Sequence, residues 1–128
     1  MIIDVSHDLS SLSTAELGKL GEDLAARYLR RAGYAILCRN WRVRYGEIDI
    51  VAAVEGVIVV VEVKTRRSTY AGVPAAAVTA AKARRLRQLA GAWMGQNSPR
   101  SRGLRIDVIA LEATGPRSLR LEHIRSAA

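Results

Sequence analysis

Two stretches of the chain, Gly46-Glu-Ile-Asp-Ile-Val51 and Val61-Glu-Val-Lys-Thr-Arg66, decide the fold that the sequence predicts. Both are rich in isoleucine and valine, which favour β-strands. Side chains of a strand alternate between its two faces. Glu47 and Asp49 should therefore share one face of the first strand, with the two isoleucines opposite. Glu62 and Lys64 should share a face of the second strand.

The dipeptide Glu55-Gly56 lies between these strands and is typical of a two-residue hairpin turn. Such a turn places residue 54 opposite residue 57 and sets the pairing along both strands. Asp49 would then stand opposite Glu62, and Glu47 opposite Lys64. Because opposed Cβ atoms on one face are roughly 4.5–5.5 Å apart, the two carboxylates should be neighbours.

Two neighbouring carboxylates repel each other unless a proton or a cation lies between them. Mg²⁺ often binds through one or two carboxylates together with water and phosphate. Asp49 and Glu62 are therefore predicted to hold Mg²⁺ or Mn²⁺, with Lys64 beside the scissile phosphate or the attacking water. The plain alternative is that Glu62 and Lys64 only form the solvated face of a strand. Acidic residues are depleted from strands in general, which favours the metal site.

The rest of the chain predicts a mixed α/β protein. Apolar residues at helical spacing predict helices at residues 14–32 and 74–95, the second with Pro74 in its first turn. Strands are expected at residues 34–43, 47–53, 57–65, 104–111 and 118–124. The order α-β-β-β-α-β-β indicates a mixed central β-sheet flanked by helices.

The first helix has a clear start signal. Ser13 is followed three residues later by Glu16, which is the spacing of a capping box. Residues 1–12 are polar and are expected to form a loosely docked tail. Residues 13–128 are long enough to bury one core and are expected to form a single domain.

Glu22 is a weaker candidate for the same site. It lies in the first predicted helix beside Gly18 and Gly21, and a glycine inside a helix costs about 1 kcal/mol relative to alanine. Glycines in such positions suggest that the helix approaches another backbone closely, which would bring Glu22 toward the carboxylate pair. The alternative is a glutamate on an exposed helix surface.

The composition indicates a folded protein with an anionic partner. The net charge of +8 at pH 7 favours nucleic acid, although an arginine-rich surface can be merely solvated. The candidate nucleic-acid contacts are Arg66, Arg67, Lys82 and Arg85. His7 and His123 show no metal-ligand spacing, so zinc is not expected. With one cysteine, no signal-peptide pattern and no apolar run that could cross a membrane, the expected location is cytoplasmic.

Several segments together resemble the YraN-like family of uncharacterised bacterial proteins. They are Gly18-Lys-Leu-Gly-Glu-Asp-Leu-Ala25, Asn40-Trp-Arg-Val-Arg-Tyr-Gly-Glu-Ile-Asp-Ile-Val51, Val61-Glu-Val-Lys-Thr-Arg66, Lys82 and Arg105-Ile-Asp-Val108. The similarity runs from about Leu17 to the C-terminus. That family is similar to the restriction-endonuclease-like fold, in particular to archaeal Holliday-junction resolvases.

The resemblance implies a metal-dependent nuclease core of the PD-(D/E)xK kind. Asp49 and Glu62 would be metal ligands, Lys64 the catalytic lysine and Glu22 the helix-borne acid, while Ile48 stands where the pattern has proline. The resemblance implies endonuclease activity, which is the hydrolysis of phosphodiester bonds within DNA, including branched or structured DNA. A homodimer is expected as well, because cleavage of a junction needs two sites.

Two other classes of function stay open. A nucleic-acid-binding module could keep this fold and have lost cleavage, although a binder has no need of buried like charges. A structural or interaction protein could use the acids only for ion pairs with Lys64 and nearby arginines. Fold similarity alone does not decide between these classes, because function rests on the site.

Overall fold

The hairpin around Glu55-Gly56 forms the centre of the fold. In the computed structural model, which describes residues 1–67 and 77–128, strands β3 (Gly46–Val54) and β4 (Val57–Arg66) pair antiparallel. Their register runs from Val54 opposite Val57 to Ile50 opposite Val61. Glu55 and Gly56 have φ angles of 50° and 79°, and positive φ at both central residues is what a tight hairpin turn requires. The predicted turn is confirmed, and the predicted register is confirmed from Ile50–Val61 to Val54–Val57. The predicted pairs Asp49–Glu62 and Glu47–Lys64 lie beyond this stretch.

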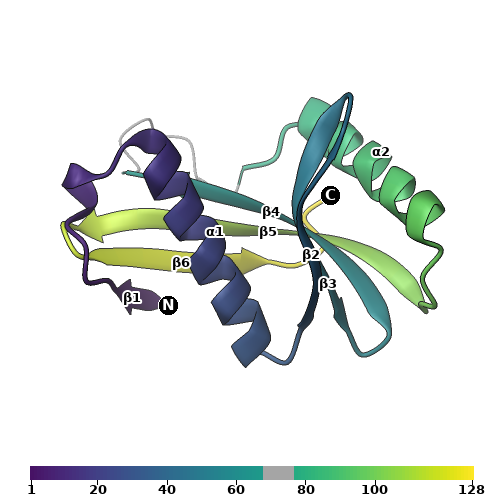
Figure 1. The fold of residues 1–128 in the computed structure, drawn as a ribbon, viewed down its shortest axis with the longest axis horizontal. Helices are drawn as coiled ribbons and strands as arrows, with labels where there is room; N and C mark the ends of the chain where they lie inside the picture. The colour runs from purple at the N-terminus through teal and green to yellow at the C-terminus, as the bar shows by residue number, and fades with distance from the viewer. Residues whose placement is uncertain (68–76) are drawn as a thin grey trace.

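Six strands form one mixed sheet in the order β1-β6-β5-β4-β3-β2 (Figure 1). The other strands are β1 (Ile2–Asp4), β2 (Ala35–Val43), β5 (Gly103–Gly115) and β6 (Ser118–Ile124), and the helices are η1 (Leu9–Ser11), α1 (Thr14–Arg31) and α2 (Ala80–Asn97). β4 and β5 run parallel, and the other neighbours run antiparallel. The predicted mixed α/β class is confirmed and is consistent with a nuclease-like fold.

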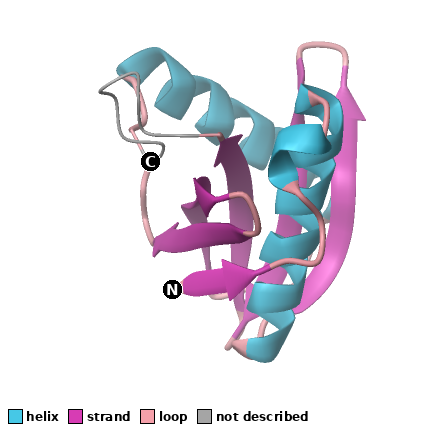
Figure 2. Ribbon diagram, turned by 90° about the vertical axis from the view of Figure 1, so that its left-hand side faces the viewer, coloured by secondary structure: helices cyan, strands magenta, loops and turns pink. Residues whose placement is uncertain are grey.

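The two helices cover opposite faces of the sheet (Figure 2). Along β4, Val59 and Val61 belong to the core packed against α1, whereas Ile58 and Val60 belong to the core packed against α2. This alternation is the one that a strand buried on both faces must show. Two separate hydrophobic cores therefore hold β4 between the helices.

The N-terminal residues differ from the expected loose tail. β1 pairs antiparallel with β6, and Leu9 in η1 is buried against the α1 core. A strand of three residues is too short to show a period of two, so its sequence carried no strand signal. The first twelve residues therefore extend the sheet at one edge, and the element order gains a strand before α1.

The second helix begins later than predicted. α2 starts at Ala80, and the side chain of Thr79 accepts a hydrogen bond from the amide of Lys82 at 3.1 Å. A threonine at this position satisfies an amide that the first helical turn leaves unpaired. The expected start at residue 74 is therefore wrong, and Pro74 itself lies outside the described residues.

Gly21 marks the point where α1 crosses the end of β4. A Cβ atom built at Gly21 would lie 1.9 Å from Oγ1 of Thr65, whereas nothing lies within 4 Å of a Cβ at Gly18. The close approach predicted from both glycines is thus confirmed at Gly21 and wrong at Gly18. The contact presses the middle of α1, including the position next to Glu22, against the strand that carries Glu62.

Replacing Gly21 by alanine should lower the free energy of unfolding by about 1–3 kcal/mol, because helix and strand must separate to admit the methyl group. The matched control is Gly18→Ala, which should raise that free energy by up to about 1 kcal/mol, since alanine is the better helix former. Urea denaturation measures both changes. Adding Thr65→Ala should restore part of the stability lost in Gly21→Ala. Equal stabilities of the two glycine variants would contradict the close contact.

Candidate metal centre

The hairpin register brings the carboxyl groups of Asp49 and Glu62 together. The pairing continues to Ile50 opposite Val61, and Asp49 and Glu62 are the next residues on their strands. Oδ2 of Asp49 accepts a hydrogen bond of 2.8 Å from the backbone amide of Val63. The two carboxyl groups lie within hydrogen-bonding reach of each other. The geometric expectation that the acids meet on one side of the hairpin is confirmed.

The strand bends at this point, which the sequence did not predict. Ile48 belongs to the core under α2, whereas Ile50 belongs to the core under α1. The expectation that both isoleucines share one face is therefore wrong. In the neighbouring strand, Asn40 has a φ angle of 54° and lies between the pairs Arg39–Ile50 and Trp41–Ile48.

The left-handed backbone at Asn40 explains the change of face. Arg39 reaches Asp23 of α1 at 2.7 Å, whereas the indole of Trp41 donates to Gln96 of α2 at 3.1 Å. Residues two apart in a regular strand would point the same way, and asparagine adopts positive φ more readily than most residues. In Figure 1 the β2–β3 hairpin stands steeply against β5 and β6. Asp49 thus sits where the hairpin turns from one face to the other.

Burial and like charge raise the pKa of Asp49. Only 9% of this residue is exposed, and burial together with the neighbouring Glu62 and Glu22 raises its pKa to about 8, against the lowering effect of the Val63 amide. The pKa of Glu22 is also raised, mainly by burial and also by Glu47, although Arg39 opposes the shift. Without a cation, the acid pair therefore keeps a proton near neutral pH.

This donor set fits a hard divalent cation. A proton on Asp49 reduces the repulsion between the two carboxyl groups, and a bound divalent cation would reduce the same repulsion. Within residues 1–67 and 77–128 there is no cluster of three or more His, Cys, Asp or Glu side chains that could hold a metal. Asp49 and Glu62 would therefore supply two ligands. The remaining positions would be left to water and phosphate, as Mg²⁺ commonly accepts.

A groove opens between the acid pair and α2. It has a volume of about 250 Å³ and is lined by Gly46, Glu47, Glu62, Lys82, Arg85, Leu86 and Leu89. Nζ of Lys82 lies 3.2 Å from Oε2 of Glu62. Two of the four cations that the sequence singled out for nucleic acid, Lys82 and Arg85, thus line a groove that also contains the candidate ligand Glu62.

Lys64 lies two residues beyond Glu62 on β4 and is exposed. Within the described part of the chain, no ion pair involves its ammonium group. The position agrees with an ammonium that is available to a bound phosphate. Its catalytic role, like that of Glu22, stays a prediction.

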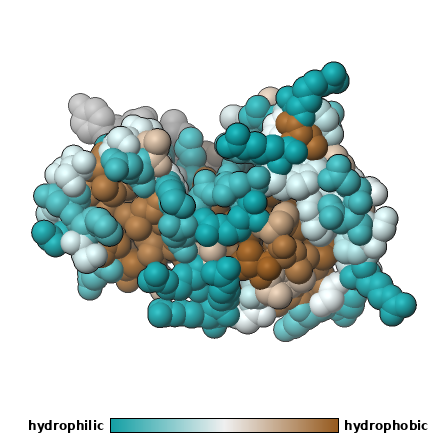
Figure 3. All heavy atoms as spheres, in the orientation of Figure 1, coloured by the Kyte–Doolittle hydropathy of each residue, from teal (hydrophilic) through white to brown (hydrophobic). Residues whose placement is uncertain are grey.

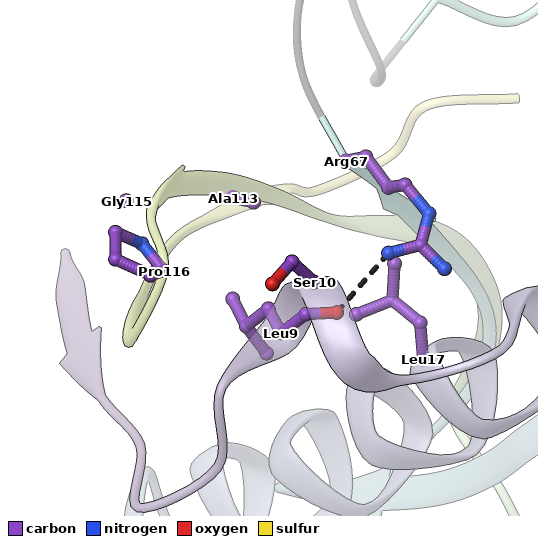
Figure 4. Close-up of a pocket in the computed structure, with 7 residues that line it drawn as sticks. All are labelled: Leu9, Ser10, Leu17, Arg67, Ala113, Gly115 and Pro116. Atoms are coloured by element: carbon purple, nitrogen blue, oxygen red, sulfur yellow. Dashed lines mark hydrogen bonds between the residues drawn. The ribbon is translucent and has the colours of Figure 1, made fainter.

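Arg67 directly follows β4, and its side chain lies against the N-terminal segment (Figure 4). Its guanidinium donates hydrogen bonds to the carbonyl oxygens of Leu9 and Leu12, which fastens the N-terminal segment to the end of β4. The cavity beside it has a volume of about 330 Å³ and is mainly apolar, with Leu17 and Pro116 in its wall. The structure gives Arg67 a structural contact, and the nucleic-acid contacts predicted for Arg66 and Arg67 stay predictions.

A second buried polar cluster was missed by the sequence analysis. The fully buried carboxylate of Asp107 accepts two hydrogen bonds of 2.9 Å from Arg105 and lies 2.7 Å from Nε2 of His123. Arg105 also donates to the hydroxyl of Tyr34, and Tyr28 lies 3.0 Å from Nδ1 of His123. The sequence signal that could have indicated this cluster is Asp107, an acidic residue within an apolar strand and two residues after Arg105.

The chain has a mixed α/β fold that is consistent with a nuclease-like one, with a pair of acidic residues at a bend of its sheet. The chain belongs to the uncharacterised protein family UPF0102, whose sequence profile matches residues 21–111. This result confirms the resemblance to the YraN-like proteins.

Three relatives illustrate the similarity, and each is a UPF0102 protein. The relative from Rhodococcus opacus is 50% identical over 111 residues, which cover 87% of this chain and 94% of the relative. The one from Mycolicibacterium vanbaalenii is 46% identical over 116 residues, covering 91% and 96%. The one from Geobacter sulfurreducens is 48% identical over 111 residues, covering 87% of each protein. All three extend the similarity over both strands of the acid pair.

The distribution of polar and apolar residues on the surface is relevant to the expected nucleic-acid and membrane partners. On the face shown in Figure 3, hydrophilic residues separate several areas in which apolar residues gather. Among the described residues, no helix is long and apolar enough to span a membrane. The homodimer and the cytoplasmic location stay predictions.

Proposed function

We propose that this protein is a metal-dependent endonuclease that uses Mg²⁺ or Mn²⁺ to hydrolyse phosphodiester bonds of DNA. Branched or structured DNA is the substrate class that the resemblance suggests. The observation that carries the proposal is the meeting of the buried carboxyl group of Asp49 with the half-buried carboxyl group of Glu62, which together with burial raises the pKa of Asp49 to about 8. Two neighbouring like charges, one of them buried, destabilise the fold, and a cation bound by both would remove this repulsion.

Each residue of the site has a defined task in this proposal. Asp49 and Glu62 hold the cation, and the Val63 amide fixes the direction of the Asp49 carboxylate through its hydrogen bond. A bound divalent cation would neutralise phosphate charge and activate water. Lys64 holds the scissile phosphate or the attacking water from the same strand, and Glu22 contributes negative charge from α1.

Recognition of DNA rests on its backbone in this proposal. Lys82 and Arg85 line the groove beside Glu62 and would contact phosphates next to the cleavage site. Contacts to phosphate hold a protein in position but carry no sequence information. We therefore expect selection by shape and not by base sequence.

Purified protein should cleave at least one of linear, flapped and four-way-junction DNA in Mg²⁺ or Mn²⁺, and cleave none of them in EDTA. Asp49→Asn and Lys64→Met should each reduce the rate about a hundredfold or more, because they remove a metal ligand and the phosphate-binding ammonium. The control is Asp23→Asn, which changes a half-exposed carboxylate of α1 that pairs with Arg39 and should keep most of the activity.

Two other results would point away from an enzyme. Binding of DNA that weakens steeply with salt, without cleavage in either metal, would favour a nucleic-acid-binding module. Neither binding nor cleavage would favour a structural or interaction protein whose acids only form ion pairs. Cleavage that is unchanged in Asp49→Asn would refute the assignment of the site.

A further inference from the structure

Lys82 holds the candidate ligand Glu62 in an ion pair across the groove. The distance from Nζ of Lys82 to Oε2 of Glu62 is 3.2 Å, and the two side chains are 31% and 20% exposed. The start of α2 positions this lysine, because its backbone amide is bonded to the side chain of the N-cap residue Thr79. The pair therefore joins the first turn of α2 to the acid pair on the hairpin.

The ammonium group of Lys82 meets the same electrostatic need as a divalent cation. Glu62 lies against the carboxyl group of Asp49, and a positive charge beside Glu62 reduces the repulsion between the two acids. A divalent cation bound to Glu62 would be repelled by the ammonium group of Lys82 if that group stayed in contact with the same carboxylate. The carboxylate therefore has two competing positive partners.

We propose that Lys82 is the internal counter-cation of the candidate metal centre. Its ammonium pairs with Glu62 while the site holds no metal, and it leaves that carboxylate when Glu62 takes up a divalent cation. This inference rests on the proposed function, because it assumes that Asp49 and Glu62 bind a metal. The new element is that Lys82 compensates the negative charge of the metal-free site. The same ion pair lowers the affinity of the site for a metal, because the pair must break before Glu62 can bind one.

The side chain and its surroundings suit such an exchange. Lysine carries its charge on a flexible four-carbon stem with three rotatable donors, so that the ammonium can move without a shift of the helix. The groove beside it, with a volume of about 250 Å³, gives the ammonium room to turn away. Arg85, one turn along the helix, lines the same groove, and no ion pair joins it to Glu62 within the described residues.

Calorimetric titration of metal-free protein with MnCl₂, without DNA, tests the exchange. Lys82→Met should bind Mn²⁺ about five- to twentyfold more tightly than the wild type, because it removes the competing charge from Glu62. Lys82→Arg keeps the charge and should stay within about twofold of the wild type. The matched control is Arg84→Met, which removes one charge from an exposed position of the same helix and should also stay within about twofold.

Two results of the titration would overturn the proposal. Unchanged or weaker Mn²⁺ binding by Lys82→Met would show that the ammonium does not compete with the cation. Equal tightening by Arg84→Met would show a general effect of net charge. Lys82→Gln serves as a second variant if Lys82→Met shows a non-native circular dichroism spectrum.

The titration also separates this inference from the proposed function. If wild-type protein binds Mn²⁺ and Asp49→Asn does not, the metal site stands whatever Lys82→Met shows. If neither the wild type nor Lys82→Met binds Mn²⁺, both the metal site and the role of Lys82 are refuted. Binding by Lys82→Met alone would support the competition in its strongest form.

Discussion

Replacement of Asp107 by alanine should lower the free energy of unfolding by about 3–5 kcal/mol, because removing one member of a buried ionic group leaves its partners uncompensated. Asp107 is fully buried and bonds at once to Arg105, His123 and the backbone amide of Ser126. The variant would leave the guanidinium of Arg105 and the imidazole of His123 without their carboxylate. Such a loss exceeds that of most single substitutions.

The large effect follows from the number of elements that meet at this carboxylate. Through Tyr28 and Tyr34 the cluster reaches α1 and the turn after it, and through Ser126 it holds the C-terminal turn beside β5. Hydrogen bonds of this kind inside a protein strengthen one another. Asp107 therefore ties α1, β5 and β6 together on one face of the sheet.

Equilibrium unfolding in urea at pH 7 measures the effect. The control is Asp23→Ala, because the ion pair of Asp23 with Arg39 is about half exposed at the carboxylate, and exposed pairs contribute only about 0–1 kcal/mol. Similar losses in the two variants would contradict the role of burial. A loss below about 1 kcal/mol in Asp107→Ala would contradict the cluster itself.

The loss should also depend on pH. Burial raises the pKa of Asp107, but the hydrogen bonds from His123, Arg105 and Ser126 outweigh it and hold the pKa below its usual value. A carboxylate with a lowered pKa stabilises the fold above its unfolded pKa, and this contribution disappears as the pH falls through the folded pKa. The destabilisation by Asp107→Ala should therefore shrink in acid.

Asp49→Asn should have the opposite effect on the metal-free protein. Because the pKa of Asp49 is raised to about 8, the folded protein retains a proton that the unfolded chain has lost above pH 4. The stabilisation linked to this proton is complete below the unfolded pKa and is lost as the pH rises through the folded pKa. Asparagine is neutral at every pH and still offers an oxygen to the Val63 amide, so it escapes that loss.

The gain in stability from Asp49→Asn should grow by about 1–3 kcal/mol between pH 5 and pH 7.5, measured by urea unfolding in EDTA. Addition of Mg²⁺ at pH 7.5 should raise the melting temperature of the wild type but not that of Asp49→Asn. Glu47→Gln, at an exposed position of the same strand, is the control and should show a nearly constant difference. A gain that stays constant with pH would contradict the burial of a protonated Asp49.

Local patterns accounted for the parts of the site that lie close in the sequence. The capping box of Ser13 and Glu16 forms as predicted at the start of α1. The Glu55-Gly56 turn and the alternation of β4 were sufficient to align Asp49 with Glu62. These features depend on backbone geometry over a few residues, so the sequence carries them directly.

Contacts over long sequence separations could not be predicted in the same way. The start of α2 at Ala80 places Lys82 against Glu62, and nothing in either local pattern specifies that pair. Asp107 meets His123 and Ser126 only after β5 and β6 have paired. Side chains far apart in the chain become partners through packing, and no period of two or 3.6 residues encodes their distance.

The hairpin of β3 and β4 shows both what the sequence determines and what it leaves to the tertiary structure. By itself, the sequence determined the turn, the register and therefore the encounter of Asp49 with Glu62, because a hairpin is a local structure with strict alternation. Only the tertiary structure decided that β3 bends at Asp49 and changes the face of Ile48. That bend depends on the left-handed Asn40 in β2 and on two helices that bury opposite faces of one hairpin.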